Sequence, residues 1–533
     1  MPRKGHPPLT RNLREAFAVA REAWERNMPP QDVAEQRRER RAVAITRRRF
    51  LGTAVAATAG LALARPLRAS GNSPRIVVIG AGLAGLRFAH ALWTRKGIAS
   101  TIYEANTRLG GRCWTNRDFF ASGQVAEQGG EFISSEHTSM RQLAAEFGFQ
   151  LANVYGGSEP AYNDVCWLDG DYYTVPELNA DLHPLLPVLA AARRAAPYPT
   201  LYNRYMQAGY ELDHMSCTDW ISRNVAGGTT SKLGRILLSN QIGEYGCEPD
   251  VQPALNLIYL ISGLGTGGLA GTDEQYHVIG GNDQIPTMMA DQLPQGSIQT
   301  GMALVALKRR SDASYTCTFE AGSGQVEVSA DHVVLALPFN QLKKVDLSKA
   351  GLSPVKMAAI NGYALGTNAK LALQCKTRPW ARPDHWSGVC YTEPQGFQLS
   401  WDATVSQNGP AGILLRFPGG NAGGANAFPG AAAHGPAPAQ YAQDFLAGVE
   451  APFPGCQASY NGLAWLDWWE QDPFIGGAYG CYQLGNYTAF AGIEKVSEGN
   501  VHFCGAQTDL DFQGFMEGAV RSAETLALRS GLF

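Results

Sequence analysis

The chain has 533 residues and a formal net charge of −3, with 45% hydrophobic and 17% charged residues. This balance is that of an ordinary globular protein of roughly two to four domains, and it excludes a disordered or fibrous chain. It provides no global basic field that would favour nucleic acid, and no charge-free apolar run of about 18 residues predicts a transmembrane helix in the mature protein.

Residues 1–69 are interpreted as an export signal with an N-terminal extension. After a cluster of arginines at residues 37–41, residues 46–52 (TRRRFLG) match the twin-arginine pattern S/T-R-R-x-F-L. A weakly apolar, alanine-rich stretch follows, with small residues near Ala64 and Ala69 where a signal peptidase could cut. We therefore expect the twin-arginine translocation machinery as a partner and a periplasmic or secreted bacterial location. A basic start to an ordinary helix is the alternative.

Residues 75–85 (RIVVIGAGLAG) predict a buried strand, a glycine turn and the start of a helix. Gly80, Gly82 and Gly85 form a GxGxxG pattern. In dinucleotide folds such glycines make the tight turn, let the backbone approach a pyrophosphate and let the helix pack on the strand. The next expected strand, residues 100–104, ends in Glu104, which is placed to bind a ribose hydroxyl. The sequence thus predicts a dinucleotide site, with a glycine-rich surface turn as the alternative.

Two further glycine pairs follow, in residues 105–115 (ANTRLGGRCWT) and 127–133 (EQGGEFI). The arginines of the first stretch could neutralise a pyrophosphate. GxGxxG, an acid, LGGRxxT and E-x-G-G in this order resemble the flavin-containing amine oxidase family, which includes monoamine, polyamine and L-amino acid oxidases. The resemblance covers residues 74–533. It implies FAD contacts at Gly80, Gly82, Gly85, Glu104, Ala105, Arg108, Gly111, Arg112, Gly129, Gly130, Glu131 and Phe132.

The resemblance also implies the fold class: α/β (α+β mixed), with a Rossmann-like FAD-binding domain and an interleaved substrate domain of mixed sheet and helices. The FAD-binding domain is expected to be discontinuous, at residues 70–150, 274–345 and 469–533. The substrate domain is expected at residues 151–273 and 346–468.

Residues 136–270 predict mainly helices, around residues 140–147, 185–195 and 232–239, and no chemistry stands out there. Glu211, Asp213 and His214 lie close together without metal-ligand spacing, so we interpret them as a solvated face and predict no metal site. The ten cysteines of the chain form no CxxC motif. We expect most of them to be small buried hydrophobic residues.

From Tyr276 the pattern indicates a glycine pair, a helix ending near Leu293, and strands at residues 302–309, 315–319, 326–328 and 330–338. The resemblance places Leu304 beside the flavin, with plain core packing as the alternative. Residues 366–373 alternate as a strand that puts Lys370 on one face with Asn368 and Ala372. A lone lysine there is usually solvated, but the resemblance implies that Lys370 holds a water against the flavin N5. Residues 410–438 predict a long flexible surface loop.

Residues 469–479 (WEQDPFIGGAY) resemble the family's W-x-x-(D/E)-x-(F/Y)-x-G-G-x-Y motif. Some monoamine oxidases bind FAD covalently through a cysteine just before the final tyrosine. This chain has Ala478 there, and Cys481 is out of register, so we expect non-covalent FAD. Tyr479 and Phe515 match the aromatic pair that flanks the amine in the family. The last FAD contacts are expected at Gly505, Gln507, Gly514, Phe515 and Met516.

The resemblance implies hydride transfer from the amine α-carbon to flavin N5, hydrolysis of the imine to an aldehyde and ammonia, and reoxidation by oxygen with release of hydrogen peroxide. Animal L-amino acid oxidases have an arginine for the substrate carboxylate where this chain has Phe132. Burying a carboxylate without a cation costs on the order of several kcal/mol, which favours a plain primary amine. An L-amino acid oxidase, an amine dehydrogenase with a periplasmic electron acceptor and a non-catalytic FAD-binding protein are the alternatives. Glu131 could bind a second ammonium of a diamine or cap backbone, and a homodimer is left open.

Overall fold

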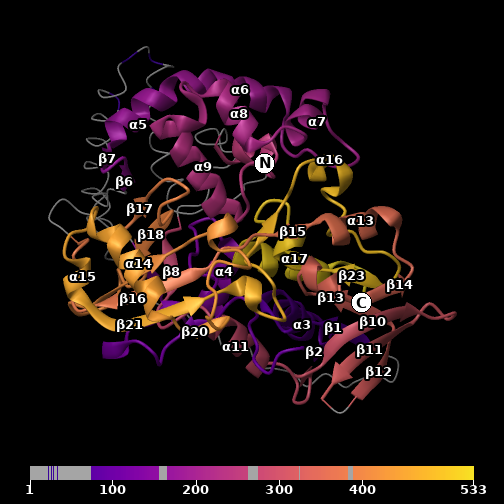
Figure 1. Cartoon of the computed structure of the whole chain (residues 1–533). Coiled ribbons are helices and arrows are strands. Elements are labelled where there is room, and N and C mark those ends of the chain that lie inside the picture. The colour runs from indigo at the N-terminus through magenta and orange to yellow at the C-terminus, as the bar shows by residue number, and fades with distance from the viewer. Residues whose placement is uncertain are drawn as a thin grey trace, which may run out of the picture.

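The computed structural model describes Glu22, Arg26, Met28 and Val33 together with residues 74–154, 165–261, 274–322, 324–381 and 388–533 (Figure 1). The expected signal region at residues 46–69 lies outside these residues. Within them, no helix is both long and apolar enough to cross a bilayer.

A parallel sheet carries the first glycine motif. Its strand order is β23-β13-β1-β2-β9, and every neighbouring pair runs parallel. All residues of β1 are buried, as expected for a strand covered on both faces. The strands come from distant parts of the chain: β1 (Ile76–Ile79), β2 (Thr101–Tyr103), β9 (Ile298–Gln299), β13 (His332–Leu335) and β23 (Val501–Phe503). Each lies in one of the three stretches expected to form the FAD-binding domain.

Helices and a second sheet cover the parallel sheet. Helix α3 (Leu83–Lys96) packs against α11 (Gln284–Asp291) and α17 (Met516–Leu528), and α17 also contacts α4 (Thr138–Glu146). An antiparallel meander with order β12-β11-β10, extended by the parallel strand β14, shares a core with β1 and β13. Its strands are β10 (Ala303–Arg309), β11 (Tyr315–Ala321), β12 (Gly324–Ala330) and β14 (Asp346–Lys349). The predicted meander is confirmed, although β14 joins it from beyond the expected boundary at residue 345.

A mixed sheet with order β20-β21-β16-β19-β18-β17-β6-β7 forms the second main layer. It joins two separate stretches of the chain: β6 (Val165–Leu168) and β7 (Asp171–Tyr173) from the first, then β16 (Lys370–Cys375), β17 (Cys390–Tyr391), β18 (Leu399–Asp402), β19 (Gly412–Arg416), β20 (His434–Pro436) and β21 (Tyr460–Asp467). Helices α14 (Ala439–Glu450) and α15 (Cys456–Ser459) share a core with this sheet. The expected class, a mixed α/β fold with a Rossmann-like part and a mixed sheet, is confirmed.

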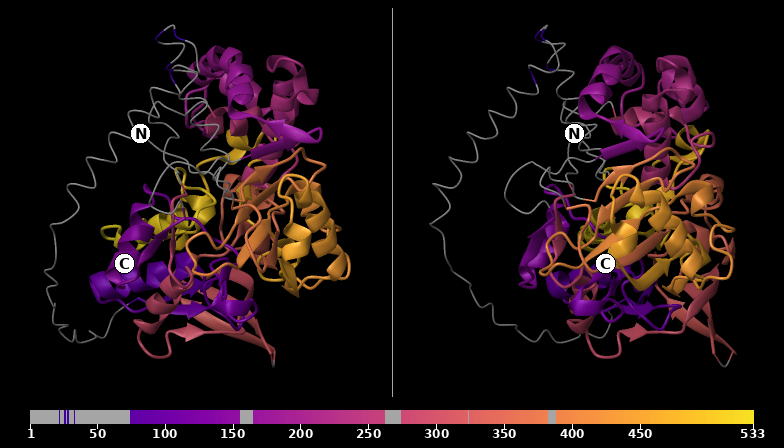
Figure 2. Two further views of the ribbon diagram at one scale, coloured as in Figure 1. Left: turned by 90° about the vertical axis from the view of Figure 1, so that its left-hand side faces the viewer. Right: turned by 60° about the vertical axis from the view of Figure 1, so that its left-hand side comes forward.

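A layer of helices lies at one end of the molecule, and the parallel sheet lies at the opposite end. The mixed sheet lies along one side, between these two (Figure 2). It consists of α5 (Val175–Leu182), α6 (Leu186–Ala195), α7 (Gln207–Asp213), α8 (Cys217–Asn224), α9 (Lys232–Tyr245) and α10 (Ala254–Ile261). Helix α9 begins after Ser231, whose hydroxyl accepts the Gly234 N–H, and it ends at Gly246 in the left-handed conformation. This cap fixes where the C-terminal end of α9 points.

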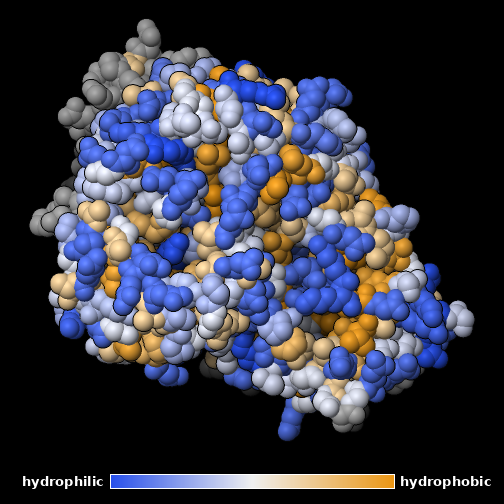
Figure 3. Space-filling view, viewed as in Figure 1, coloured by the Kyte–Doolittle hydropathy of each residue, from blue (hydrophilic) through white to orange (hydrophobic). Residues whose placement is uncertain are grey.

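Short elements connect the layers. They are α12 (Phe339–Leu342), α13 (Pro354–Gly362), α16 (Asn486–Phe490), β3 (Thr115–Asn116), β4 (Ala126–Glu127), β5 (Leu151–Asn153), β8 (Tyr276–Val278), β15 (Ala364–Leu365) and β22 (Gly480–Cys481). The face shown in Figure 3 is mostly hydrophilic, with apolar residues gathered in patches between the polar ones.

Several sequence expectations are wrong in detail. Residues 410–438 are not a flexible surface loop, because they contain β19 and β20 and bury Phe428, which is 2% exposed. Asp213 is not part of a solvated face: it is fully buried and accepts the Thr488 N–H (2.8 Å) and hydroxyl (2.7 Å). The strand expected from residue 366 begins only at Lys370. By contrast, the prediction for the cysteines is confirmed, since all ten are buried thiols.

Candidate active site

A cavity of about 490 Å³ lies between the layers and is lined by residues from each predicted motif. All residues expected to contact FAD or substrate line this cavity except Gly85: Gly80, Gly82, Glu104, Ala105, Arg108, Gly111, Arg112, Gly129, Gly130, Glu131, Phe132, Leu304, Lys370, Tyr479, Gly505, Gln507, Gly514, Phe515 and Met516. The fold therefore brings together side chains that are up to several hundred positions apart in the sequence.

Gly85 lies behind the residues that line the cavity and is not itself a lining residue. A Cβ placed on Gly85 would come within 1.9 Å of the Gly80 carbonyl oxygen, so helix α3 can approach the turn only with glycine here. Gly80 itself has φ +102°, a conformation that L side chains rarely adopt. These two glycines set the position of α3 relative to the end of β1.

The first turn of α3 presents unused backbone N–H groups to the cavity. Gly82 precedes the helix without a side-chain cap, and the first turn holds no acid. The backbone of Gly111 approaches that of Gly82 so closely that a Cβ on Gly111 would lie 3.2 Å from the Gly82 Cα. A helix N-terminus with exposed N–H groups favours an anion, and close backbone approach suits a pyrophosphate.

The two arginines of the second motif have different surroundings. Arg108 donates to the Gly111 carbonyl oxygen (2.6 Å), and its guanidinium lies 4.1 Å from the centre of the Trp114 ring. Burial lowers the pKa of Arg112 to about 10, and within the described parts of the chain no carboxylate forms an ion pair with it. A cation in a cavity wall without a protein anion fits a ligand that carries phosphate groups.

Two backbone N–H groups fix the carboxylate of Glu104, which directly follows β2. One carboxylate oxygen accepts the Ala81 N–H (2.6 Å) and the other accepts the Asn106 N–H (2.8 Å). Burial raises the pKa of this carboxyl group despite the two donors. Each carboxylate oxygen has a further lone pair, so a ribose hydroxyl can still donate to Glu104.

A second helix N-terminus faces the cavity at α17. Phe515 precedes this helix without a side-chain cap. Glu517 in its first turn instead accepts the N–H groups of Ser139 (3.0 Å) and Met140 (2.9 Å), which begin α4. The first N–H groups of α17 therefore remain for a ligand beside Met516. Together with Arg112 and the glycine turns, they fit a dinucleotide with a ring system that accepts hydrogen bonds.

Lys370, the first residue of β16, forms a buried ion pair at the cavity wall. Its Nζ lies 2.7 Å from Glu131 Oε2 and donates to the Glu127 carbonyl oxygen at 3.0 Å. Trp401 Nε1 donates to the other oxygen of Glu131 (2.9 Å). Glu131 therefore pairs with Lys370 and Trp401, and these partners differ from the backbone cap and the second substrate ammonium that the sequence leaves open for it.

Two further buried groups have shifted pKa values: Glu127 lies beside this pair, and His137 lies beside Phe515. Burial raises the pKa of Glu127 to about 8, although the Asn282 N–H and the Thr115 hydroxyl donate to it. Burial lowers the pKa of His137 to about 3, so this imidazole is neutral. Its ring lies 5.4 Å from the Phe515 ring and supports it from behind the cavity.

Tyr479 lines the cavity with its hydroxyl group donating to the carbonyl oxygen of Gly243 in α9. Burial, and then the charges of Glu244 and Glu274, raise the pKa of the Tyr479 hydroxyl well above its usual range. A neutral phenol is thereby fixed in place, with two carboxylates within electrostatic reach.

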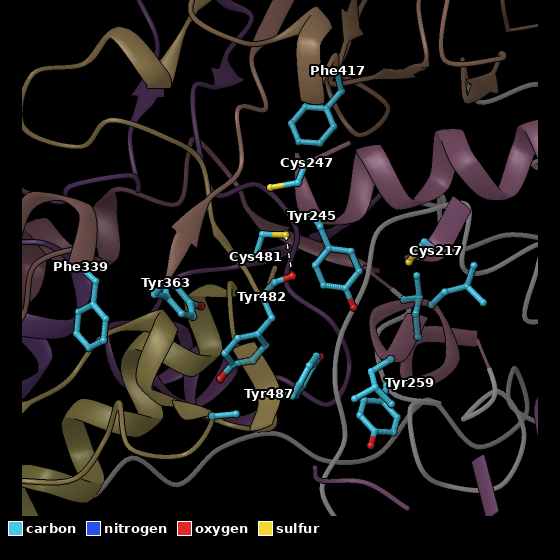
Figure 4. Close-up of a cluster of buried hydrophobic side chains, with 14 of the residues drawn as sticks. Cys217, Tyr245, Cys247, Tyr259, Phe339, Tyr363, Phe417, Cys481, Tyr482 and Tyr487 are labelled. Atoms are coloured by element: carbon cyan, nitrogen blue, oxygen red, sulfur yellow. Dashed lines mark hydrogen bonds between the residues drawn. The ribbon is translucent and has the colours of Figure 1, made fainter. Parts of the chain in front are cut away.

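Sequence reasoning did not identify several lining residues: Glu244, Tyr245, Glu274, Asn368, Trp401 and Phe417. The signal available in the sequence was weak, since Glu244 is an acid in an otherwise uncharged stretch, residues 236–247. Figure 4 shows Phe417 and Tyr245 with the neighbouring Cys481. Cys481 is not a lining residue, and its Sγ donates to the Tyr482 carbonyl oxygen (3.4 Å), whereas Ala478 does line the cavity.

Comparisons with known proteins agree with these motifs. Residues 83–529 match the model of the flavin containing amine oxidoreductase family. AofH of Mycobacterium tuberculosis, named for a flavin-containing monoamine oxidase, is 25% identical over 480 residues, which span 87% of this chain and 98% of that protein. An L-amino acid dehydrogenase of Synechocystis is 22% identical over 492 residues, 86% of this chain and 95% of its own.

Solved structures share the fold. Cyclohexylamine oxidase from Brevibacterium oxydans is similar with a TM-score of 0.72 and 19% identity, over 86% of this chain and 98% of that one. Putrescine oxidase in complex with putrescine gives a TM-score of 0.68 at 19% identity, with the same two coverages.

Proposed function

This chain belongs to the family of flavin-containing amine oxidoreductases, and we propose that it is an FAD-dependent oxidase of primary amines. The overall reaction converts a primary amine, water and oxygen into an aldehyde, ammonia and hydrogen peroxide. When bound, FAD supplies the acceptor for the hydride and electrons of the amine α-carbon. The side chains of the cavity bind and orient the amine and exclude water.

The observation that carries this proposal is the chemistry of the cavity away from the glycine turns. There, the described lining residues include aromatic rings and the carboxylates of Glu244 and Glu274. The lining arginines are Arg108 and Arg112, which belong to the predicted FAD motif. A substrate carboxylate would meet acids and aromatic rings at this end, whereas an amine can lie against the ring faces.

Three residues have roles that follow from their contacts. The rings of Tyr479 and Phe515 are walls that can orient the amine and exclude water. An ammonium has three N–H donors, and Lys370 uses two on Glu131 and the Glu127 carbonyl oxygen, so a third can hold a water in the cavity. We propose Lys370 for that role, as the family resemblance implies.

Two observations support non-covalent binding of FAD. Ala478 offers no nucleophile at the position where covalent members of the family carry cysteine. The nearby thiol of Cys481 is fully buried outside the cavity lining. A covalent link would need a thiolate at the cavity, and this chain provides none at that position.

One of the relatives is named an L-amino acid dehydrogenase. The two alternative activities, oxidation of L-amino acids and transfer of electrons to an acceptor other than oxygen, are therefore tested as well. Oxygen uptake and peroxide release should be measured with a panel of primary amines and L-amino acids. We expect turnover and peroxide with amines. Turnover with L-amino acids alone would contradict the substrate class, and reduction without oxygen uptake would make the enzyme a dehydrogenase.

We also propose that the protein is exported by the twin-arginine route, on the basis of residues 46–52. The route carries folded proteins, so FAD would be acquired in the cytoplasm. Replacing the two arginines at positions 47 and 48 by lysine should leave the precursor in the cytoplasm of a producing bacterium. Unchanged periplasmic activity would contradict this assignment.

A further inference from the structure

His434 in β20 lies between two aspartates that come from different parts of the chain. Its Nδ1 lies 2.8 Å from Oδ1 of Asp467, the last residue of β21, and its Nε2 lies 3.2 Å from Asp472 Oδ2. Asp472 directly follows the short helix η5 (Trp469–Gln471). The three side chains are at most 12% exposed. The imidazole therefore joins the mixed sheet to the segment that contains Trp469.

The geometry calls for a proton on both ring nitrogens of His434. A neutral imidazole has one N–H donor and one acceptor, whereas an ionised carboxylate only accepts, so only the imidazolium can donate to both aspartates. Burial raises the pKa of Asp472, but donation by His434 and by the Phe474 N–H lowers it further, so this carboxyl group is ionised. Burial by itself lowers the pKa of His434, but the hydrogen bonds and charges of Asp467 and Asp472 raise it above its usual value of 6.5.

A row of alternating charges crosses the mixed sheet at this point. Lys370 in β16 and His434 in β20 are both register partners of Asp467 in the strand between them, so the three residues share one face of the sheet. Lys370 Nζ is engaged by Glu131 at 2.7 Å. Asp467 Oδ1 also accepts a hydrogen bond from Gln128 Nε2 (2.6 Å). The pairing of Lys370 with Glu131 leaves His434 as the cation in hydrogen-bond contact with Asp467.

Two tryptophan rings connect His434 to the cavity. The centres of the Trp114 and Trp469 rings lie 5.1 Å and 4.6 Å from the centre of the imidazole ring. The guanidinium of Arg108 lies 4.1 Å and 5.9 Å from the centres of the same two rings. Arg108 and Trp469 line the cavity, and Arg108 belongs to the predicted FAD motif. A change at His434 therefore reaches the cofactor side of the cavity through these rings.

The charge of His434 also affects Arg108. Asp472, Glu104 and Asp467 all act electrostatically on the Arg108 guanidinium. While His434 is protonated, it offsets one of the two aspartate charges. After it loses the proton, both aspartates attract Arg108 in competition with the anionic phosphate groups of FAD. The proton on His434 and the bound phosphates therefore favour each other, and this coupling is reciprocal.

We propose that His434 is a positioning residue for FAD: in its protonated form it fastens residues 469–475 to the mixed sheet and leaves Arg108 available to the phosphates, so the protein binds FAD more tightly in acidic than in alkaline solution. Trp469, Pro473, Phe474 and Ile475 of this segment line the cavity. The inference goes beyond the oxidation of amines, because it concerns retention of the cofactor and holds for any substrate.

The first test uses the wild-type holoenzyme. The protein is diluted in steps at several pH values between about 5 and 9, and the fluorescence of released FAD gives the dissociation constant. The contribution of His434 is complete below about pH 6.5 and is lost as the pH rises through its raised pKa. A pKa that shifts by about one unit on binding changes the affinity about tenfold, so we expect the dissociation constant to rise by about that factor. A constant value would overturn the proposal.

The second test assigns the pH dependence to the imidazole. His434→Gln keeps a donor and an acceptor but carries no charge, and His214→Gln at an exposed position is the matched control. At about pH 6 we expect His434→Gln to raise the dissociation constant about tenfold, to the wild-type value at about pH 9, and to remove the pH dependence. Adding Asp472→Asn removes a charge that the imidazolium offsets, so the double variant should recover tight binding at about pH 6. The control should follow the wild type.

These outcomes distinguish the charge of His434 from a purely structural role. A structural role alone would weaken FAD binding equally at both pH values, and the double variant would bind FAD no better than His434→Gln. Either of these results, or the same pH dependence in His434→Gln and in the wild type, would overturn the proposal. Circular dichroism checks the folding of each variant. If His434→Gln does not fold, the wild-type profile decides: a rise with its midpoint above about pH 6.5 supports the proposal, and a constant value overturns it.

Discussion

Replacing Lys370 by methionine tests the ion pair at the wall of the cavity. Lys370 Nζ lies 2.7 Å from Glu131 Oε2, and the two side chains are only 6% and 7% exposed. Methionine fills a similar volume but carries no charge. The Glu131 carboxylate would then remain buried with Trp401 Nε1 as its hydrogen-bond donor.

The cost of this change can be estimated from the burial. Removing one partner of a buried ion pair costs about 3–5 kcal/mol, because the other charge is left uncompensated. We therefore expect Lys370→Met to lower the free energy of unfolding by about that amount. The double variant Lys370→Met/Glu131→Gln buries no charge at this site, so it should recover most of the loss.

The assay combines denaturant unfolding with kinetics of the bound flavin. Unfolding is followed by circular dichroism and flavin fluorescence for the single and double variants, and Lys376→Met, at an exposed position directly after β16, is the control. Stopped-flow measurements should show slower flavin reduction or reoxidation in Lys370→Met with FAD still bound. Wild-type stability together with unchanged rates in both half-reactions would refute the role of Lys370 and of its pair.

Three further predictions concern the cofactor and the buried acids. Arg112→Met should lower the FAD content of the purified protein, measured by absorbance, because the cavity loses a cation that no carboxylate of the described residues pairs with, whereas the exposed Arg310→Met should not. Acid precipitation should release the flavin into the supernatant, and yellow colour in the pellet would contradict non-covalent binding. Burial raises the pKa of Glu127 from 4.5 to about 8. The contribution of this group to stability is therefore complete below pH 4.5, and it is lost as the pH rises from 4.5 through 8. Between these values wild-type stability in denaturant titrations should fall relative to Glu127→Gln by at most about 1.4 kcal/mol per pH unit, and parallel curves would refute the shift.

The glycine motifs could be predicted because their requirement is local. Gly80 has a left-handed backbone conformation, and at Gly85 there is no room for a side chain beside the Gly80 carbonyl oxygen. Both positions therefore require glycine, and the glycines in the sequence predict the turn. The same holds for Glu104, which ends a short strand at a fixed distance from the turn. Local constraints of this kind identified most of the residues that line the cavity around the glycine turns.

The partners of the functional side chains were not local and could not be predicted. Glu131 and Lys370 meet across 239 positions of the chain, and nothing in either segment indicates the pairing. Glu244 lies in the last turn of helix α9 and Glu274 precedes strand β8, so only the fold brings both within electrostatic reach of Tyr479. The stretch around Phe428 is rich in glycine and alanine, and this composition predicts a loop. A few apolar side chains, such as Phe428, nevertheless hold the stretch in the core.

The most direct test of the amine oxidase account is an anaerobic titration of the purified flavoprotein with a primary amine. The account predicts that one equivalent of a primary amine substrate bleaches the flavin absorbance and that admission of air restores it with one equivalent of hydrogen peroxide. A flavin that stays oxidised with every amine, or that only L-amino acids reduce, would contradict it.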